Sequence, residues 1–591
     1  MKRQTKEKKI FIIKQLPFVI SILAILAVIY DLGFNHQPYE QEVLQMIYLC
    51  TMFVGVVSIV ARYFLRKTRP KLKVLPFDFL FLLFLIFLIS LEVKMLLENH
   101  FSFSHFLKKR AWVYLALFFI FIRELSSSRI DFRRIIINPA KLFISSFILL
   151  ILAGGGLLLL PKATHTGISM IDALFTSTSA VCVTGLVVVD TGSFFTEFGQ
   201  FIIVMLIQLG GIGIMTFASY FSYFFKAGTS YENQLLLSAM TNTEKIGEVF
   251  NTLKKIIFIT FFIESIGALL IFQSINKAMI PSFLDRAFFS VFHSISGFCN
   301  AGFTTLQNSL YEPAFRFNYP LHLIIASLII LGGIGFPIVS NLLNYLRNYL
   351  KNLLLHIFGR KQHRHLPRII NINTRIVLIT SLILTVLGTI LFYIFEYNST
   401  LSEHSSLGKI ITAFFGSVTA RTAGFNTVDT SSLRVPTLMI VLFLMWIGAS
   451  PASTGGGIKT STLAVAFLNF ISLAKGKPNI EVFRREIAHT SVNRAFAIIV
   501  LSILVIFIAI FSIGMFEIEK GLLNISFECV SAFGTVGLSR GITADLSNHS
   551  KFVLILTMFI GRVSMLTILI ALFKKLAHHQ YRYPTEELLI N

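Results

Sequence analysis

The chain has 591 residues, of which 55% are hydrophobic and only 14% are charged. Its mean hydropathy is +0.76, and apolar runs of about 20 residues recur along it, so the composition excludes a soluble protein and indicates an all-α polytopic membrane protein. The formal net charge of +23 does not indicate a nucleic-acid partner, because the basic residues fall between apolar segments, as they do in cytoplasmic loops.

Residues 1–138 are expected to form a separate helical membrane module, with spans at about 10–31, 44–64, 76–97 and 108–123. The basic segment 66–73 predicts a cytoplasmic loop and the acidic segment 31–42 an external one, which places the N-terminus in the cytoplasm. The fourth span fits this rule least well, because Lys108, Lys109 and Arg110 would lie at its outer side. The sequence gives this module no function beyond packing or contact with a partner.

From residue 139 onward the chain contains a fourfold internal repeat. The glycines Gly185, Gly302, Gly424 and Gly537 lie 117, 122 and 113 residues apart by subtraction, and a phenylalanine precedes each of them by ten residues. Four such matches at near-equal spacing indicate a repeated structural unit. The motifs are Ser179-Ala-Val-Cys-Val-Thr-Gly-Leu186, Ser296-Gly-Phe-Cys-Asn-Ala-Gly-Phe303, Val418-Thr-Ala-Arg-Thr-Ala-Gly-Phe425 and Ser531-Ala-Phe-Gly-Thr-Val-Gly-Leu538.

Each repeat predicts a long apolar helix, an apolar half-helix that ends at the glycine motif, and a second long helix. The repeats are expected at 139–226, 255–358, 370–475 and 493–575, with a cytoplasmic tail at 576–591. The half-helices are too short to cross a membrane, so they should enter it and return where protein or water surrounds their backbone. Basic residues concentrate at 347–375 and 475–494, which predicts that these loops are cytoplasmic and that the four glycine turns enter from outside.

The glycine turns favour a function in cation transport. A re-entrant half-helix directs the partly negative end of its dipole into the membrane, which favours a cation. Glycine permits backbone dihedrals that turn carbonyl groups toward a common axis, and a ring of carbonyls can replace the hydration shell of a monovalent cation. The four motifs contain no ring of Asp or Glu, so they predict no divalent-cation filter. The alternative interpretation is that these glycines are only helix-packing points.

The repeats and their motifs, among them Arg421-Thr-Ala-Gly-Phe-Asn-Thr427 and Ser531-Ala-Phe-Gly-Thr-Val-Gly-Leu-Ser539, resemble those of the TrkH/KtrB family of potassium-uptake subunits, kin of the plant HKT transporters. The resemblance covers about residues 139–575 and implies potassium transport through a pseudo-fourfold pore, with no enzymatic activity. In that superfamily a serine in place of the first filter glycine accompanies sodium transport, and this chain has Gly185 there. The resemblance implies a K+ filter of Val183, Thr184, Gly185, Asn300, Ala301, Gly302, Thr422, Ala423, Gly424, Thr535, Val536 and Gly537.

The same resemblance implies partners. Family members are homodimers in the bacterial-type plasma membrane, the cell inner membrane, and sit on a cytoplasmic ring of RCK-type nucleotide-binding regulatory subunits. This chain has no Gly-x-Gly-x-x-Gly after a strand-like run, so the nucleotide is expected on a separate chain and no cofactor in this one. Besides membrane lipid, the expected contacts are regulatory subunits docked on the basic loop 347–375 and on the tail after Phe573.

Two features are candidates for a gate. The second helix of the third repeat is interrupted by residues 446–460, in which Gly455, Gly456, Gly457 and Lys459 indicate a polar segment lining a cavity below the filter rather than an ordinary cytoplasmic loop. Arg562 lies near the middle of the apolar run 552–573, beyond the reach of a snorkelling side chain, so it is expected to face the pore. The family has an intramembrane gating loop and a pore arginine at these places.

Three further charged residues lie in the repeats. Glu264 and Glu528 are expected either to pair with Lys459 or Arg562 or to act as hydrogen-bonded structural acids, and Glu528 could also favour cations near the filter. Arg540, at the outer mouth, would oppose cations unless an acid neutralises it. Cys182 and Cys299, at matching places in the first two repeats, are interpreted as small packing residues.

Two alternative functions stay open. A sodium or non-selective monovalent cation transporter on the same fold should tolerate serine at Gly185. A membrane-embedded transferase would need polar catalytic groups gathered at one interface, but the external loops offer only His165, Asp190 and Glu197, without an acid pair or metal spacing.

Overall fold

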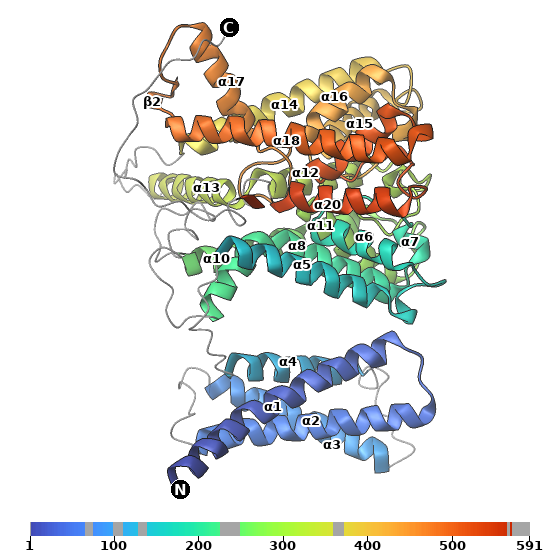
Figure 1. The fold of residues 1–591 in the computed structure, drawn as a ribbon, viewed down its shortest axis with the longest axis vertical. Helices are drawn as coiled ribbons and strands as arrows, with labels where there is room; N and C mark the ends of the chain where they lie inside the picture. The colour runs from blue at the N-terminus through green and yellow to red at the C-terminus, as the bar shows by residue number, and fades with distance from the viewer. Residues whose placement is uncertain are drawn as a thin grey trace. The chain divides into compact units, whose positions relative to one another are not determined.

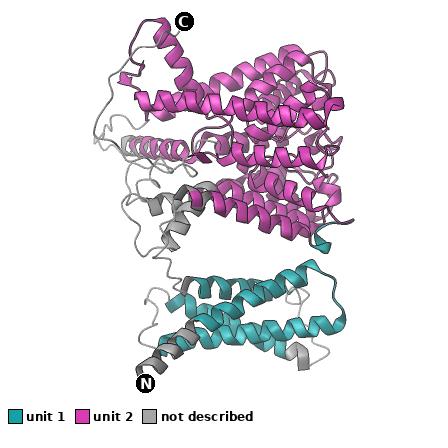
Figure 2. Ribbon diagram, in the orientation of Figure 1, with its two compact units in different colours: residues 1–135, 160–165, 223–228 teal, residues 136–159, 166–222, 229–591 magenta. Residues whose placement is uncertain are grey.

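The computed structural model describes residues 2–64, 75–97, 110–127, 139–224, 249–357, 371–563 and 568–569, which are mostly helical (Figure 1). The chain divides into two compact units, one of residues 1–135, 160–165 and 223–228 and the other of 136–159, 166–222 and 229–591 (Figure 2). The basic segments 66–73 and 358–370, Lys108, Lys109 and the tail after Phe573 lie outside the described residues. The docking surfaces expected on the second segment and the tail therefore stay predictions.

The first unit contains the four helices expected in the N-terminal module, α1 Lys2–Gly33, α2 Pro38–Phe64, α3 Leu75–Leu97 and α4 Ala111–Ser127. Apolar residues such as Met52, Leu85 and Ile120 form its core. Arg110, which appeared misplaced at the outer side, lies 3.4 Å from Asp31. The same carboxylate accepts hydrogen bonds from Tyr48 and Tyr114. An acid from α1 therefore compensates the basic residue before α4.

The second unit contains the four repeats. The first repeat consists of α5 Pro139–Leu158, α6 Met170–Val181, α7 Thr191–Phe194 and α8 Glu197–Phe224, and the second of α10 Val249–Ser274, α11 Phe283–Cys299, α12 Tyr319–Ile334 and α13 Phe336–Ile357. The third consists of α14 Ile372–Glu396, α15 Ser406–Thr419, α16 Val435–Trp446 and α17 Thr460–Ala474, and the fourth of α18 His489–Phe516, α19 Leu522–Gly534 and α20 Asn548–Val563. A short antiparallel hairpin, β1 Glu481–Val482 and β2 Arg485–Glu486, lies between the last two repeats.

The half-helices α6, α11, α15 and α19 begin where local chemistry favours a helix start. Ser169, Ser282 and Ser405 are the N-caps of the first three, and each side chain accepts a hydrogen bond from the backbone three residues later. Such a cap satisfies one of the amide groups that a helix start leaves unpaired. The fourth half-helix follows Gly521, whose φ of 79° permits the sharp turn after α18.

In three repeats the half-helix is fastened to the first helix in the same way. The hydroxyls of Ser177, Ser294 and Ser417 donate to backbone carbonyls of the preceding long helix. A Cβ added at Gly154, Gly267 or Gly388 would lie within 2.5 Å of the same hydroxyls. Small residues thus let each half-helix approach its neighbour closely enough for a hydrogen bond, as in other helical membrane proteins.

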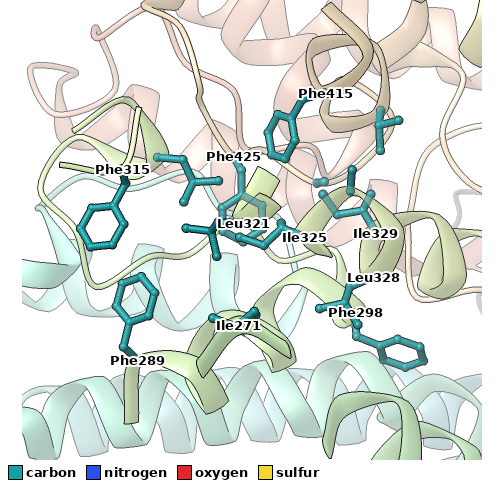
Figure 3. Close-up of a cluster of buried hydrophobic side chains, with 14 of the residues drawn as sticks. Ile271, Phe289, Phe298, Phe315, Leu321, Ile325, Leu328, Ile329, Phe415 and Phe425 are labelled. Carbon is teal, nitrogen blue, oxygen red and sulfur yellow. The ribbon is translucent and has the colours of Figure 1, made fainter. Parts of the chain in front are cut away.

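An aromatic and aliphatic core joins the second and third repeats. Phe289, Leu321, Ile325, Phe415 and Phe425 are at most 3% exposed and belong to one cluster. In Figure 3, Phe425 lies beside Leu321 and Ile325 of α12. Since Phe425 directly follows Gly424, this packing holds the third glycine turn in place.

The second helix of the second repeat is also broken, which the sequence interpretation missed. The axes of α12 and α13 differ by 103° at Gly335, whose φ is 90°. Pro337 follows and cannot donate a helical hydrogen bond, so the run Leu331-Gly-Gly-Ile-Gly-Phe-Pro337 carried the signal. Among the described residues, six helices are long and apolar enough to cross a membrane, or seven if this bent pair counts as one span. The sequence predicts twelve spans, four in the N-terminal module and two in each repeat. The structure gives fewer because α16 and α17 are the two short halves of an interrupted helix and other helices are described only in part.

Candidate functional site

The four glycine turns share one unusual backbone conformation. In each repeat the motif glycine and the residue two positions before it have positive φ values, with 55° at Val183 and 86° at Gly185 in the first repeat. The same pair occurs at Asn300 and Gly302, at Thr422 and Gly424, and at Thr535 and Gly537. Non-glycine residues seldom adopt this region, so its recurrence in every repeat marks a site rather than an isolated irregularity.

The four turns meet in a closed ring. A Cβ placed on Gly185 would lie 2.3 Å from the carbonyl oxygen of Ala301 in the second repeat. The same relation joins Gly302 to Ala423 at 2.5 Å, Gly424 to Val536 at 2.2 Å, and Gly537 back to Thr184 at 2.3 Å. Each glycine therefore faces the carbonyl of the residue before the next glycine, and the order of the repeats around the ring is their order in the chain.

The backbone amides of the turns are hydrogen-bonded away from the ring. Thr184 N donates to Ser179 O at 2.7 Å, and equivalent bonds run from Ala301, Ala423 and Val536 to the ends of their own half-helices. Gly185 N donates to the hydroxyl of Ser179, as Gly537 N does to that of Ser531. With these donors directed backward, the carbonyl groups of the turns are left for the ring. The twelve expected filter residues are buried, apart from the half-buried Gly537.

A vestibule of about 360 Å³ lies over the ring, and all four glycines line it. Its wall includes two carboxylates, Asp190 and Asp429, which the sequence interpretation did not assign to the pore. Alignment of the repeats could have found them, because each lies five residues after its glycine, in the first and third repeats. Both side chains also accept hydrogen bonds from backbone amides, Ser193 N and Ser431 N, and so have fixed positions.

The glycine-rich interruption of the third repeat lies directly against the ring. Gly456 N donates to the hydroxyl of Thr535 at 3.0 Å, and Thr454 Oγ1 donates to Phe298 O. A Cβ at Gly455 would lie 2.4 Å from Thr422 Oγ1, so this segment follows the contour of the third and fourth glycine turns. Lys459 donates to the carbonyls of Gly455 and Gly456, and Gly457 has a φ of 65°. The segment is therefore packed against the glycine turns of the third and fourth repeats, and its role as an intramembrane gating loop stays a prediction.

Arg562 connects this loop to the first repeat. Its side chain is 6% exposed and donates to the carbonyl of Thr454 in the loop and, at 3.0 Å, to that of Gly210 in α8. The two gate candidates therefore contact each other. Helix α20 is described only as far as Val563, so most of the second half of the apolar run around Arg562 is outside the described residues.

The other charged residues have hydrogen-bonding partners of their own. Glu264 accepts from Gln208 at 3.0 and 3.2 Å, and Glu528 accepts from Ser539, from Arg540 N and from Thr543. Within the described residues, neither carboxylate forms an ion pair with Lys459 or Arg562. The structural-acid interpretation therefore fits both.

Arg540 and the cysteines are explained by local contacts. The guanidinium of Arg540 donates to Asn524 and, at 3.0 Å, to Ser431 O, and it does not line the vestibule. Cys182 and Cys299 are buried free thiols, and the sulfur of Cys299 fills the space beside Gly211.

Comparison with known proteins agrees with this architecture. The chain is 36% identical over 464 residues to the potassium/sodium uptake protein NtpJ of Enterococcus hirae. The alignment covers 77% of this chain and 97% of that protein. It is also 36% identical over 452 residues to the Ktr system potassium uptake protein B of Bacillus subtilis, covering 76% and 96%. The crystal structure of the potassium transporter TrkH from Vibrio parahaemolyticus has the same fold, with a TM-score of 0.59, 18% identity, and coverage of 84% of this chain and 97% of that one.

The family model described as "TrkH: Cation transport protein" matches residues 135–582, which include all four repeats and both gate candidates. This match covers most of the chain, and it excludes the transferase alternative because the family is one of transporters. The chain is a multi-pass membrane protein of the TrkH family of cation transport proteins.

Proposed function

We propose that this chain mediates potassium uptake across the plasma membrane through a filter of backbone carbonyls formed by its four glycine turns. The observation that carries the proposal is the closed ring in which each motif glycine faces a carbonyl of the next repeat. Carbonyl rings of this kind replace the hydration shell of a monovalent cation. The half-helices end at the ring, so their dipoles add a negative potential there.

In this proposal the loop with Gly455, Gly456, Gly457 and Lys459 closes the path below the filter. Arg562 holds the loop in place and adds a positive charge to the closed path, which opposes a cation. Opening then requires the loop to leave Thr422 and Thr535.

We further infer a homodimer in a bacterial-type inner membrane, with the N-terminus in the cytoplasm. Separate cytoplasmic RCK-type subunits would bind the regulatory nucleotide. The support for separate subunits is that the Bacillus relative is named as part of a Ktr system, together with the basic segments of this chain that the positive-inside rule assigns to the cytoplasm.

The first test replaces Gly185 with serine and measures rubidium uptake into liposomes, with excess potassium or sodium as competitor. The native chain should be inhibited by potassium and not by sodium. Because serine at a φ of 86° is strained and its Cβ would meet Ala301 O, Gly185→Ser should reduce the preference for potassium by at least about tenfold, or about 1.4 kcal/mol.

Gly156→Ser is the matched control, because a Cβ at Gly156 meets no atom within 4 Å, and it should keep the native preference. Equal competition by sodium in the native chain would instead support a non-selective or sodium-transporting protein, an alternative that the name of the Enterococcus relative keeps open. If Gly185→Ser behaved like Gly156→Ser, the first glycine turn would not determine selectivity.

A further inference from the structure

A second cavity lies away from the vestibule, among α12, α14 and α15. Its volume is about 240 Å³, and its lining is mainly aliphatic and aromatic, including Ile330, Leu378 and Phe414. One charged residue, Arg421, contributes to the same wall. A cavity with apolar walls and one fixed polar group is the usual form of a small-molecule site.

Arg421 is only partly satisfied by the protein. It donates to Ser381 O at 3.1 Å, to Thr385 Oγ1 at 2.9 Å and to Ser381 Oγ at 3.3 Å, while its buried Nε has no partner. In the described part of the chain, no carboxylate lies within ion-pair distance of it. A purely structural role, in which Arg421 links the turn after α15 to α14, would explain the three hydrogen bonds. A neutral side chain could form such bonds without the free-energy cost of burying a charge. The unpaired cation calls for an anion.

The surroundings of the cavity indicate where that anion would come from. Leu382, at the rim, is 65% exposed, and Ile379 and Ile383 beside it on α14 are also exposed. Ser381 and Thr385 lie near the middle of this 25-residue apolar helix. The cavity therefore opens on an exposed apolar surface near the middle of a membrane-length helix. A hydrated phosphate headgroup does not reach that depth, because burying such a charge in hydrocarbon is costly.

We propose that this cavity binds a fatty acid, with its carboxylate on Arg421 and its acyl chain against Ile330, Leu378 and Phe414. A fatty acid can cross the hydrocarbon layer as the neutral acid and bind as the carboxylate, with its proton released to bulk water. A charge-assisted hydrogen bond between the carboxylate and the guanidinium then compensates both charges. A phospholipid tail would fill the apolar part of the cavity and leave Arg421 without its anion. Ala449 and Gly333 also line the cavity. The bound fatty acid would therefore contact the segment that leads into the glycine-rich loop.

The test measures quenching of a rim tryptophan by dibromostearic acid in phosphatidylcholine vesicles at neutral pH. Leu382→Trp is introduced into the full chain after Trp112 and Trp446 are replaced by phenylalanine, which removes both native tryptophans. Val500→Trp is the control, because it is 61% exposed on α18 and reports only general partition into the bilayer. Half-maximal quenching at Leu382→Trp should need roughly tenfold less acid than at Val500→Trp, as one charge-assisted hydrogen bond provides.

Two comparisons isolate the role of Arg421. The methyl ester of dibromostearic acid, which lacks the carboxylate, should quench both tryptophans alike, and Arg421→Gln in the Leu382→Trp chain should remove the preference for the acid. The ester comparison uses an unaltered Arg421, so it stays informative even if Arg421→Gln fails to fold. Equal quenching of both tryptophans by the acid, or an equal preference for the ester, would overturn the proposal. The assay needs no transport, so its result is independent of the proposed function.

Discussion

At the scale of single residues, two aspartates place carboxylates in the wall of the vestibule. Asp190 and Asp429 come from the first and third repeats, which lie opposite each other in a ring ordered 1–2–3–4, and both line the cavity above the glycines. Carboxylates around such a concave surface raise the local concentration of cations. We expect Asp190→Asn with Asp429→Asn to lower rubidium uptake several-fold at low ionic strength. The loss should fade near 1 M salt, where the screening length falls to about 3 Å.

Two features of the experiment separate an effect of charge from an effect of structure: the choice of asparagine as the replacement, and a control substitution at a third aspartate. Asparagine also accepts a backbone hydrogen bond at a helix start, so the two replacements change charge more than structure. Asp285→Asn, on α11 and outside the vestibule lining, should have no salt-dependent effect. A loss of uptake that did not respond to salt would argue against electrostatic attraction.

Arg562 is the residue whose removal tests the proposed closure by the loop. It joins Thr454 of the loop to Gly210 of α8, and hydrogen bonds to a charged group contribute about 1.5–3 kcal/mol. Arg562→Met should release the loop and raise uptake by the purified chain roughly tenfold. Arg494→Met, which removes an exposed arginine of α18, should leave uptake unchanged. Unchanged or lower uptake in Arg562→Met would contradict a role in holding the loop closed.

At the scale of elements, a carboxylate fastens the turn after α18 to the start of α20. Glu517 accepts hydrogen bonds from Ser547 N at 2.7 Å and from Ser550. Burial raises the pKa of Glu517, but these hydrogen bonds outweigh it and hold the pKa below its ordinary value. The stabilisation is therefore fully present above the unfolded-state pKa of about 4.3 and is lost as the pH falls through the folded-state pKa.

We accordingly expect Glu517→Gln to lower the melting temperature of the detergent-solubilised chain at pH 7. The difference from the native chain should shrink at pH values below about 4. Glu519→Gln, at an exposed neighbouring residue, should leave the melting temperature unchanged both at pH 7 and at low pH. The measurement is thermal unfolding at both pH values, and a difference that persisted at low pH would show that the charge of Glu517 is not the cause.

The elements that the sequence predicts best are those with a repeated pattern. Four glycine motifs in register were enough to locate the half-helices, and the triple glycine at 455–457 located the loop. The bend at Gly335 was missed, although Gly332, Gly333 and Pro337 surround it, because a single broken helix was expected. The cavity beside Arg421 could not be predicted, since it depends on how α12, α14 and α15 pack together.

At the scale of the whole molecule, the second unit, with its four repeats, is expected to function without the N-terminal module. The family match begins at residue 135, and the Enterococcus relative is 97% covered by an alignment to 77% of this chain. A chain that lacks residues 2–134 should therefore still insert into the membrane and take up rubidium. Deletion of residues 493–575 should abolish uptake, because the ring then lacks its fourth turn. Loss of uptake with normal insertion in the first deletion would assign the module a part in transport.

The bend at Gly335 has a mechanical consequence. Gly333 O accepts from Ser450 N, and Phe336 N donates to Ala452 O, so both sides of the bend are hydrogen-bonded to the glycine-rich loop of the third repeat. Helix α13 extends from this point away from α7 (Figure 1), and its 22 residues span about 33 Å. The geometry is that of a lever arm whose bend, at Gly335, is hydrogen-bonded to the loop. A rotation of about 10° at Gly335 would move the far end of such a helix by roughly 6 Å, so a small displacement of the loop would become a large one at the end of α13.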